Sequence, residues 1–234
     1  MDPLHLALCA LGGYLAGSIP TGVLLGRLAG KDPRSAGSGN IGASNVTRTL
    51  GKKLGALTLV VDVLKGWLPT LAAAHLLPAE SALTGALIAG FAAVVGHCFP
   101  IWLKFAGGKG VATSFGAVAG VMPMVGIIAA LVWAGLVFFT RIPTIGSLIA
   151  ATLFVGLAYV ESHPFEVHLF TLALFALIVV RHASNLRVLR DRWSKKPTKK
   201  AYKRPPRPAH RQPTPKGTRP RTPGAKAEKG RRKR

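Results

Sequence analysis

Charged side chains are scarce over most of this chain. Asp and Glu together number eight in 234 residues. Four long segments contain no Lys or Arg: 1–26, 66–103, 110–140 and 142–180. A water-soluble domain carries charges along its whole surface, so these segments exclude an ordinary soluble fold. The two cysteines lie far apart inside apolar runs, and we expect neither a disulfide framework nor a cysteine metal site.

Apolar runs take the place of the missing charges. Hydrophobic residues make up 49% of the sequence, and the mean hydropathy is +0.35. A helix needs about 20 apolar residues to cross the hydrocarbon core of a bilayer. Six runs approach or exceed that length: 4–25, 54–77, 83–103, 111–140, 142–159 and 165–180. The pattern predicts an all-α polytopic membrane protein, and the first run, which no basic segment precedes, is expected to be a retained span.

The positions of the basic residues predict the topology. Most of them group at 27–53, at 104–109, at Arg141 and from residue 181 onward, and the positive-inside rule places these groups in the cytoplasm. A single span over 111–140 would put the second and third groups on opposite sides of the membrane. The run must therefore be two helices, divided at Met122-Pro123-Met124. We predict about seven transmembrane helices, with the N-terminus outside and the C-terminus inside.

Residues 195–234 differ in composition from the rest of the chain. They hold 17 of the 31 Lys and Arg, eight prolines and one acid, Glu228. A segment with so few large apolar side chains cannot bury a core, so we expect a disordered cytoplasmic tail after a membrane domain at 1–194. Its charge suits anionic lipid headgroups or RNA as partners.

The first polar motif is RSAGSGNIGASN, at residues 34–45. Its glycines have the G-x-G-x-x-G spacing of a dinucleotide-binding loop, and Asp62 follows at the distance of the ribose-binding acid. That fingerprint requires a preceding strand and a βαβ unit, whereas this loop follows a membrane span, so a dinucleotide is not expected. Small polar residues beside Arg34 and Arg48 instead favour a nest of backbone amides for phosphate. The alternative is a flexible polar loop without a ligand.

Two further motifs are predicted on the same face of the membrane. KFAGGKGVAT, at 104–113, places Lys109 between glycines before an apolar run; it is not a Walker A loop, but a lysine and free amides at a helix start attract phosphate. RHASNLRVLR, at 181–190, places His182 and Asn185 on one face of a continuing helix, where an imidazole could orient or deprotonate a hydroxyl. The alternatives are lysines that only mark the membrane boundary and an ordinary interfacial histidine. Together the three motifs predict a cytoplasm-facing phosphate pocket walled by helices.

Asp62 and Lys65 place opposite charges three residues apart inside an apolar run. Ionisable residues within a membrane span are costly and often functional. Two interpretations remain: a role in a site, or an intrahelical ion pair close to the membrane surface. For His97 we favour an interhelical hydrogen bond over a role as a ligand.

Five segments together resemble one protein family. They are GSIPTGVLLGRL at 17–28, DPRSAGSGNIGASNVTR at 32–48, DVLKG at 62–66, GHCFPIWLKFAGGKGVAT at 96–113 and RHASNLRVLR at 181–190. In this order and spacing they resemble the bacterial membrane acyltransferases that move a fatty acyl group from acyl phosphate to glycerol 3-phosphate. The resemblance implies a seven-helix enzyme of the bacterial cytoplasmic (inner) membrane, with its active site facing the cytoplasm. It would make 1-acylglycerol 3-phosphate for phospholipid biosynthesis, and the enzyme that makes acyl phosphate would be its functional partner.

The resemblance also implies which residues form the site. The substrate and phosphate contacts would come from Ser38, Gly39, Asn40, Ser44, Asn45, Arg48, Gly107, Gly108, Lys109, Ser147, His182 and Asn185. The members with a part in catalysis would be Ser38, Arg48, Lys109, His182 and Asn185, without a metal or cofactor. Acyl phosphate is already activated, so alignment and charge stabilisation carry most of the rate, and either His182 or a substrate phosphate oxygen would take the hydroxyl proton. Two departures from the family pattern are Ser44, where threonine is more frequent, and the absence of a Gly-x-Glu ending after Asn185.

A membrane transporter of organic phosphates is the main alternative function. An anion site in a helical bundle would suit it, but no inverted repeat is visible and the polar groups are confined to one face, which argues against alternating access. A soluble-type acyltransferase that uses acyl-CoA is not expected, because the chain contains no His-x₄-Asp pair.

Overall fold

The structure is a computed structural model that describes residues 2–194. Met1–Arg192 form one unit and Trp193–Arg234 a second. Throughout residues 2–194 the regular structure is helical, which confirms the predicted all-α class. The predictions for residues 195–234, disorder and the binding of lipid headgroups or RNA, lie outside the described residues, and the domain boundary at residue 194 stays a prediction.

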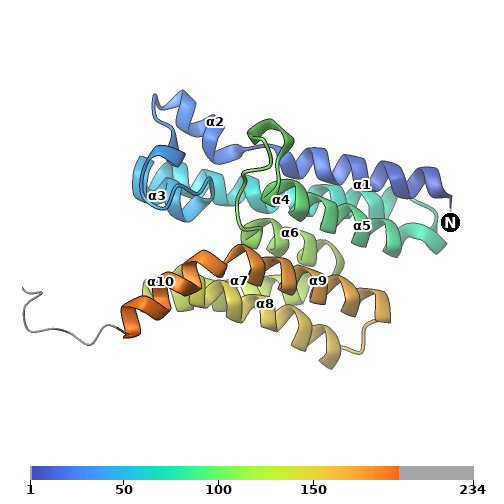
Figure 1. The fold of residues 1–234 in the computed structure, drawn as a ribbon. Helices are drawn as coiled ribbons and strands as arrows, with labels where there is room; N and C mark the ends of the chain where they lie inside the picture. Colours follow the sequence, from blue (N-terminus) through green and yellow to red (C-terminus); the bar gives the residue numbers. More distant parts are fainter. Residues whose placement is uncertain (1, 195–234) are drawn as a thin grey trace, which may run out of the picture. The chain divides into compact units, whose positions relative to one another are not determined.

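Ten α-helices and two 3₁₀ turns follow one another in the described part of the chain. They are α1 Pro3–Ser18, α2 Thr21–Leu28, η1 Pro33–Ser35, α3 Ala43–Leu50, α4 Lys52–Leu76, α5 Ala79–Cys98, η2 Ile101–Leu103, α6 Val111–Val121, α7 Pro123–Thr140, α8 Pro143–Val160, α9 Phe165–Arg181 and α10 Ala183–Ser194. Helices α1, α4 and α5 lie side by side in one half, α7, α8 and α9 lie in the other, and α6 packs between the halves (Figure 1). Helices α2, α3 and α10 lie at the end opposite the N-terminus (Figure 1).

Prolines decide where several helices begin. A residue that precedes proline avoids the helical conformation for steric reasons. Ile19, before Pro20, has a ψ of 114°, and Met122, before Pro123, has a ψ of 82°, so α1 and α6 end there. The predicted division at Met122 is confirmed. The break at Ile19, inside the first apolar run, is a finding of the structure.

Glycines allow the helices to approach closely. A Cβ atom at Gly17 of α1 would collide with the backbone of Ala93 on α5, and one at Gly116 of α6 would collide with the backbone of Val63 on α4. In lipid there is little hydrophobic drive between helices, so close backbone packing at small residues supplies much of the association. These close contacts, between α1 and α5 and between α4 and α6, hold in place the helices that carry the polar loops.

The main apolar core lies among α5 to α9. Phe115 of α6 packs edge-on against Phe154 of α8 and Trp133 of α7, with ring centroids 5.8 Å and 6.0 Å apart. Such aromatic contacts bury large apolar areas in a defined geometry. Core packing therefore also fixes Phe115 and Trp133, which form one wall of the cavity described below.

The helices are long and apolar enough for a multi-pass membrane protein. The segments that could each cross a bilayer are Pro3–Leu28, Lys52–Leu76, Ala79–Leu103, Pro123–Thr140 and Pro143–Val160. The pair α9 and α10, bent by 52°, is a sixth candidate, whereas the shorter apolar α6 does not reach that length. Large apolar side chains such as Leu131 and Phe138 are exposed on the outer faces, as lipid contact requires. The count of seven spans and the orientation stay predictions.

Candidate active site

The loop between α2 and α3 is folded around one side chain, Asn45. Its amide nitrogen donates to the carbonyl oxygens of Pro33 at 2.7 Å, Asn40 at 2.8 Å and Ala36 at 3.2 Å. Its amide oxygen accepts a hydrogen bond from the backbone N–H of Ser38 at 2.8 Å. Asn45 is 2% exposed, so water does not compete for these bonds. Asn45 therefore shapes the loop, and its polar atoms are already engaged.

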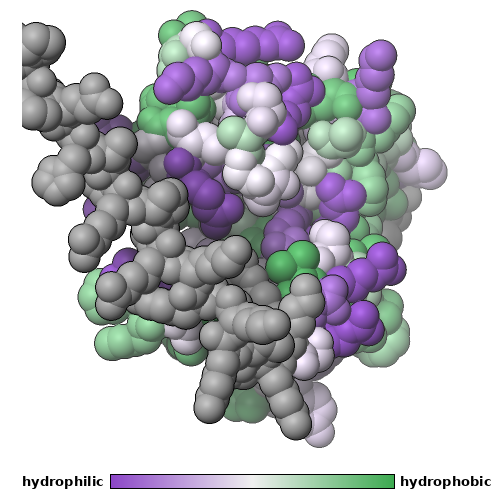
Figure 2. All heavy atoms as spheres, turned by 60° about the vertical axis from the view of Figure 1, so that its left-hand side comes forward, coloured by the Kyte–Doolittle hydropathy of each residue, from purple (hydrophilic) through white to green (hydrophobic). Residues whose placement is uncertain are grey.

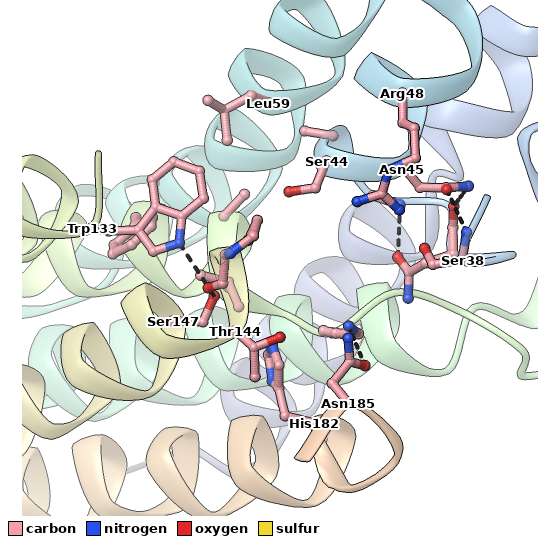
Figure 3. Close-up of a pocket in the computed structure, with 18 residues that line it drawn as sticks. Ser38, Ser44, Asn45, Arg48, Leu59, Trp133, Thr144, Ser147, His182 and Asn185 are labelled. Carbon is pink, nitrogen blue, oxygen red and sulfur yellow. Dashed lines mark hydrogen bonds between the residues drawn. The ribbon is translucent and has the colours of Figure 1, made fainter. Parts of the chain in front are cut away.

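The same loop and α3 direct other polar groups into a cavity. Ser38, Asn40 and Ser44 line it, together with Arg48, which lies one helical turn after Ser44. Figure 3 shows Ser44 and Arg48 projecting from α3 into the same space. No hydrogen bond joins the Ser44 hydroxyl or the Arg48 guanidinium to another described residue. These groups are free to bind an anion by charge-assisted hydrogen bonds.

Arg34 does not belong to this set. Its guanidinium pairs with Asp32 at 2.6 Å. This side-chain hydrogen bond is the main reason why the pKa of Asp32 is lowered to about 2. Because Arg34 is already neutralised and does not line the cavity, the cation that this motif offers to a phosphate is Arg48.

The loop between α5 and α6 is held from two sides. The backbone amides of Gly107 and Gly108 donate to the carbonyl oxygens of Cys98 at 3.2 Å and His97 at 2.9 Å. Their own carbonyl oxygens each accept a hydrogen bond from the Arg181 guanidinium, at 2.9 Å. Neither glycine lines the cavity, and both N–H groups are already engaged, so a direct contact with phosphate stays a prediction. Their role is to anchor the backbone beside Lys109.

Lys109 belongs to this loop, and its side chain lines the cavity. Its Nζ atom donates to Oδ1 of Asn185 at 2.6 Å. Burial, followed by the charges of Arg181 and Arg48, lowers the pKa of Lys109 to about 8. No carboxylate is found among the lining residues in the described part of the chain. Several cations thus crowd together without a counter-ion, and a bound phosphate would relieve their repulsion.

The third motif is bent, which corrects the prediction of a continuing helix. Helix α9 ends at Arg181, α10 begins at Ala183, and the two axes differ by 52°. His182, 2% exposed, sits at the bend, and its Nδ1 atom lies 2.8 Å from the carbonyl oxygen of Ile178. A carbonyl oxygen can only accept, so Nδ1 carries a hydrogen, and in the neutral ring Nε2 then keeps a free lone pair. His182 and Asn185 still meet at the cavity, although not on one straight helix.

These groups surround one cavity of about 140 Å³. Its lining consists of Ser38, Asn40, Gly42, Ala43, Ser44, Asn45, Arg48, Leu59, Lys109, Val111, Ala112, Phe115, Trp133, Pro143, Thr144, Ser147, His182 and Asn185. In the close-up Ser38, Ser44, Asn45 and Arg48 lie on the side of α3, and His182 and Asn185 lie near the bend before α10, whereas Trp133 lies on the other side with Thr144 and Ser147 of α8 (Figure 3). Seen from this end of the molecule, hydrophilic residues are grouped on the surface and apolar residues lie at its flanks (Figure 2). The site can therefore take a ligand with an anionic head and an apolar chain.

Comparison with known proteins agrees with this geometry. The family model described as glycerol-3-phosphate acyltransferase matches residues 7–192. The chain belongs to this family. Relatives with the same name occur in Myxococcus xanthus, 47% identical over 74% of this chain and 90% of the relative, and in Geobacter sulfurreducens, 46% identical over 76% of this chain and 90% of the relative.

Solved structures of the family share the fold. The glycerol 3-phosphate form of PlsY (YgiH), described as an integral membrane glycerol 3-phosphate acyltransferase, has a TM-score of 0.74 and 38% identity, and the match covers 80% of this chain and 93% of PlsY. The lysophosphatidic acid form has a TM-score of 0.72 and 37% identity over the same shares. The chain is accordingly an integral membrane protein of the acyltransferase family.

The structure brings together nine of the twelve residues predicted from the family resemblance. The three that do not line the cavity are Gly107, Gly108 and Gly39. Gly39 serves the loop turn instead, with a φ of 69° and its N–H donated to the carbonyl oxygen of Ala36 at 3.1 Å. A positive φ of this kind suits glycine, which has no Cβ to collide with its own backbone.

Ser147 lines the cavity in a supporting role. Its hydroxyl donates to the carbonyl oxygen of Pro143 at 2.8 Å and accepts a hydrogen bond from the indole nitrogen of Trp133 at 3.2 Å. The donor and one of the two acceptor lone pairs of the hydroxyl are engaged, so Ser147 helps to fix the position of Trp133. A buried indole N–H needs an acceptor, and a tryptophan inside an apolar run was the available signal for this wall.

Arg181 is the other residue that the sequence analysis left without a role. In the sequence, the sign that Arg181 could have a role in the site was its position directly before His182. Its function became visible through its two bonds to the loop carbonyls.

Proposed function

We propose that this chain transfers a fatty acyl group from acyl phosphate to the sn-1 hydroxyl of glycerol 3-phosphate, giving 1-acylglycerol 3-phosphate and phosphate. One observation carries the proposal: a single cavity joins the unpaired cation Arg48 and the half-buried cation Lys109 to an apolar wall that includes Leu59 and Phe115. Both substrates and the leaving group contain phosphate, and one substrate contains an acyl chain. The printed names of the relatives support glycerol 3-phosphate as the acceptor.

The free groups suggest how the substrates are held. Arg48 and the Ser44 hydroxyl would bind phosphate oxygens, since neither is hydrogen-bonded to other described side chains. Lys109 lines the cavity, hydrogen-bonded to Asn185, and would face the negative charge that develops at the reacting carbonyl. His182 keeps Nε2 available for the glycerol hydroxyl. The protein would thus align two activated partners more than it would activate either of them.

The proposed reaction transfers the acyl group from acyl phosphate to glycerol 3-phosphate inside the cavity. The hydroxyl oxygen of glycerol 3-phosphate attacks the acyl carbonyl carbon and forms the new ester bond. The bond between that carbon and the phosphate oxygen breaks, and phosphate leaves with the electron pair. The hydroxyl proton passes either to Nε2 of His182 or to a phosphate oxygen of the substrate, and general base catalysis of this kind contributes about 10²- to 10⁴-fold.

An assay with purified protein tests the proposal. Acyl phosphate and glycerol 3-phosphate should yield lysophosphatidic acid and phosphate in equal amounts, whereas acyl-CoA in a parallel reaction should yield neither. Absence of product from acyl phosphate would overturn the proposal. Uptake of labelled glycerol 3-phosphate into liposomes without acylation would instead support a transporter.

The lowered pKa of Lys109 predicts the pH dependence of the reaction. A lysine with a pKa of about 8 is protonated below that value and neutral above it. If the cation is required, kcat/KM falls as the pH rises through about 8, because kcat/KM reports ionisations of the free enzyme. Saturating substrate should move the decline of kcat to higher pH, since bound phosphate favours the charged lysine. A flat kcat/KM between pH 7 and about 9.5 would contradict the requirement.

We further propose that the protein resides in the bacterial cytoplasmic (inner) membrane with this site facing the cytoplasm. The enzyme that makes acyl phosphate would supply the donor.

All cavity residues precede the basic segment that begins at residue 195, so truncation after Lys196 should leave kcat/KM unchanged. The measurement is the same assay with full-length and truncated protein in neutral detergent, and a loss of more than about tenfold, 1.4 kcal/mol of transition-state binding, would show that the tail contributes to catalysis. Binding of anionic lipid vesicles or RNA by the full-length protein alone would identify the partner of the tail.

A further inference from the structure

A buried charged group lies next to the cavity but does not line it. Asp62 and Lys65 of α4 form an ion pair at 2.9 Å, with side chains 3% and 4% exposed. The pair is intrahelical, as one interpretation of the sequence expected, and it is buried within the protein. Taking two charges out of water is unfavourable, and a buried ion pair often stabilises a fold no better than apolar residues of the same volume. A buried pair of this kind points to a role other than stability.

Lys65 connects this pair to the loop that carries Ser38. Its Nζ atom also donates to the carbonyl oxygen of Ile19 at 2.9 Å, at the break between α1 and α2. Helix α2 in turn packs against the loop between α2 and α3: a Cβ at Gly22 would collide with the carbonyl oxygen of Ile41. Val23 of α2, Ile41 of the loop and Leu103 of η2 form one buried apolar cluster. The bond to Ile19 thus sets the position of a helix that supports both loops of the site.

His97 connects the same pair to Lys109. Its Nδ1 atom lies 3.7 Å from Oδ1 of Asp62, is buried, and has no hydrogen-bond partner among the described residues. The His97 carbonyl oxygen accepts the Gly108 N–H at 2.9 Å. The His97 ring fills the space that a Cβ at Gly108 would occupy. The backbone immediately before Lys109 therefore rests on His97, which faces Asp62.

We propose that Asp62, Lys65 and His97 are positioning residues. They hold the loop between α2 and α3 (the Ser38 loop) and the loop between α5 and α6 (the Lys109 loop) in fixed positions on the two sides of the site. The proposal rests on the proposed function for its kinetic readout, but not for its binding readout. Misplacement of catalytic groups by about 1 Å can lower a rate by about 10²-fold, so a small shift of either loop would be visible. No substrate contact by these three residues is required.

The decisive variant removes the charges and keeps the volume. Replacement of Asp62 alone would leave a buried unpaired lysine and endanger folding, so the test uses the double variant Asp62→Asn with Lys65→Met. We expect it to fold with a melting temperature near that of the unchanged protein, while kcat/KM falls by about 10- to 10²-fold and affinity for glycerol 3-phosphate, measured by calorimetry, weakens by about tenfold. The matched control is Thr70→Val. The Thr70 hydroxyl is buried on the same helix and bonds only to the carbonyl oxygen of Gly66, so this change should leave both values intact.

A pH profile separates positioning from general destabilisation. The charged or titratable groups that face Lys109 are Arg48 from α3, Arg181 from α9 and His182 from the bend. If the Lys109 loop loosens in the double variant, the lysine becomes less buried and its pKa rises. The decline of kcat/KM should then move from about pH 8 to higher pH. Destabilisation without movement of the loop would leave the decline in place.

The outcomes distinguish the two proposals. Wild-type glycerol 3-phosphate affinity and an unshifted pH profile in the double variant would overturn the positioning role, as would an equal loss of affinity in Thr70→Val. If the wild-type protein binds glycerol 3-phosphate but forms no product, the proposed function fails while the affinity comparison still tests positioning. If the double variant does not fold, Val23→Ala replaces it, with Val167→Ala as the control because both valines are 1% exposed. A selective loss of affinity in Val23→Ala supports positioning, and equal losses overturn it.

Discussion

Lys109→Ala is expected to lower kcat/KM by about 10³-fold while the protein still folds and inserts into membranes. Lys109 is a cation that lines the cavity, and it holds Asn185 through a 2.6 Å hydrogen bond. Loss of one well-placed donor to a developing oxyanion costs about 10²- to 10³-fold in other acyl-transfer enzymes. Lysine also supplies a full charge in a partly buried site, which places the effect at the upper end. Initial rates with acyl phosphate and a thermal unfolding curve in detergent measure the two parts of this prediction.

Lys104→Ala is the matched control for that experiment. Lys104 belongs to the same loop but is exposed and does not line the cavity. It should keep activity within about twofold of the unchanged protein, in line with other surface substitutions. Near-normal rates in Lys109→Ala, or equal losses in both variants, would remove Lys109 from the reaction.

Asn45→Ala is expected to have the second largest effect, although Asn45 does not need to touch substrate. The change removes four hydrogen bonds and leaves the carbonyl oxygens of Pro33, Ala36 and Asn40 without their common donor. Each neutral bond contributes about 1 kcal/mol, and unpaired buried groups cost more. The loop that carries Ser38 should lose its shape, so we expect KM for glycerol 3-phosphate to rise and kcat/KM to fall by about 10²-fold.

Two companion variants identify the cause of that loss. Asn45→Asp keeps the volume and the acceptor for Ser38 but removes the amide donors, so it should be as impaired as Asn45→Ala. Thr49→Val removes a hydroxyl on the same helix that bonds only to the carbonyl oxygen of Asn45, and it should remain close to full activity. Full activity in Asn45→Asp would show that the donated bonds do not matter. Impairment of Thr49→Val would point to α3 as a whole.

Some parts of the site were predictable because short stretches of sequence determine them. The density of Gly, Ser and Asn beside Arg48 indicated a loop for anions, and Ser38, Asn40, Ser44, Asn45 and Arg48 from this stretch do line one cavity. The break at Met122 followed from the charges on either side of the run and from the proline next to it. In each case the signal lies in the same stretch of the chain as the feature that it predicts.

Other assignments failed because they depended on partners far away in the chain. Gly107 and Gly108 read as free amides, but Cys98, His97 and Arg181 occupy their backbone groups. The sequence alone did not show that the ion pair of Asp62 and Lys65 would be buried. Spacing within a motif does not reveal which atoms a distant segment has already bound.

The sequence by itself determined that this is an all-helical membrane protein, because hydropathy acts locally and the bilayer imposes a simple rule on every span, and it predicted three motifs that bind anions. Only the tertiary structure decided which groups of those motifs are free for substrate and which hold the backbone in place. The physical reason is that a hydrogen-bond donor serves one partner well at a time. Asn45 and the amides of Gly107 and Gly108 form hydrogen bonds within the fold, whereas the Arg48 guanidinium and Nε2 of His182 remain available to bind substrate.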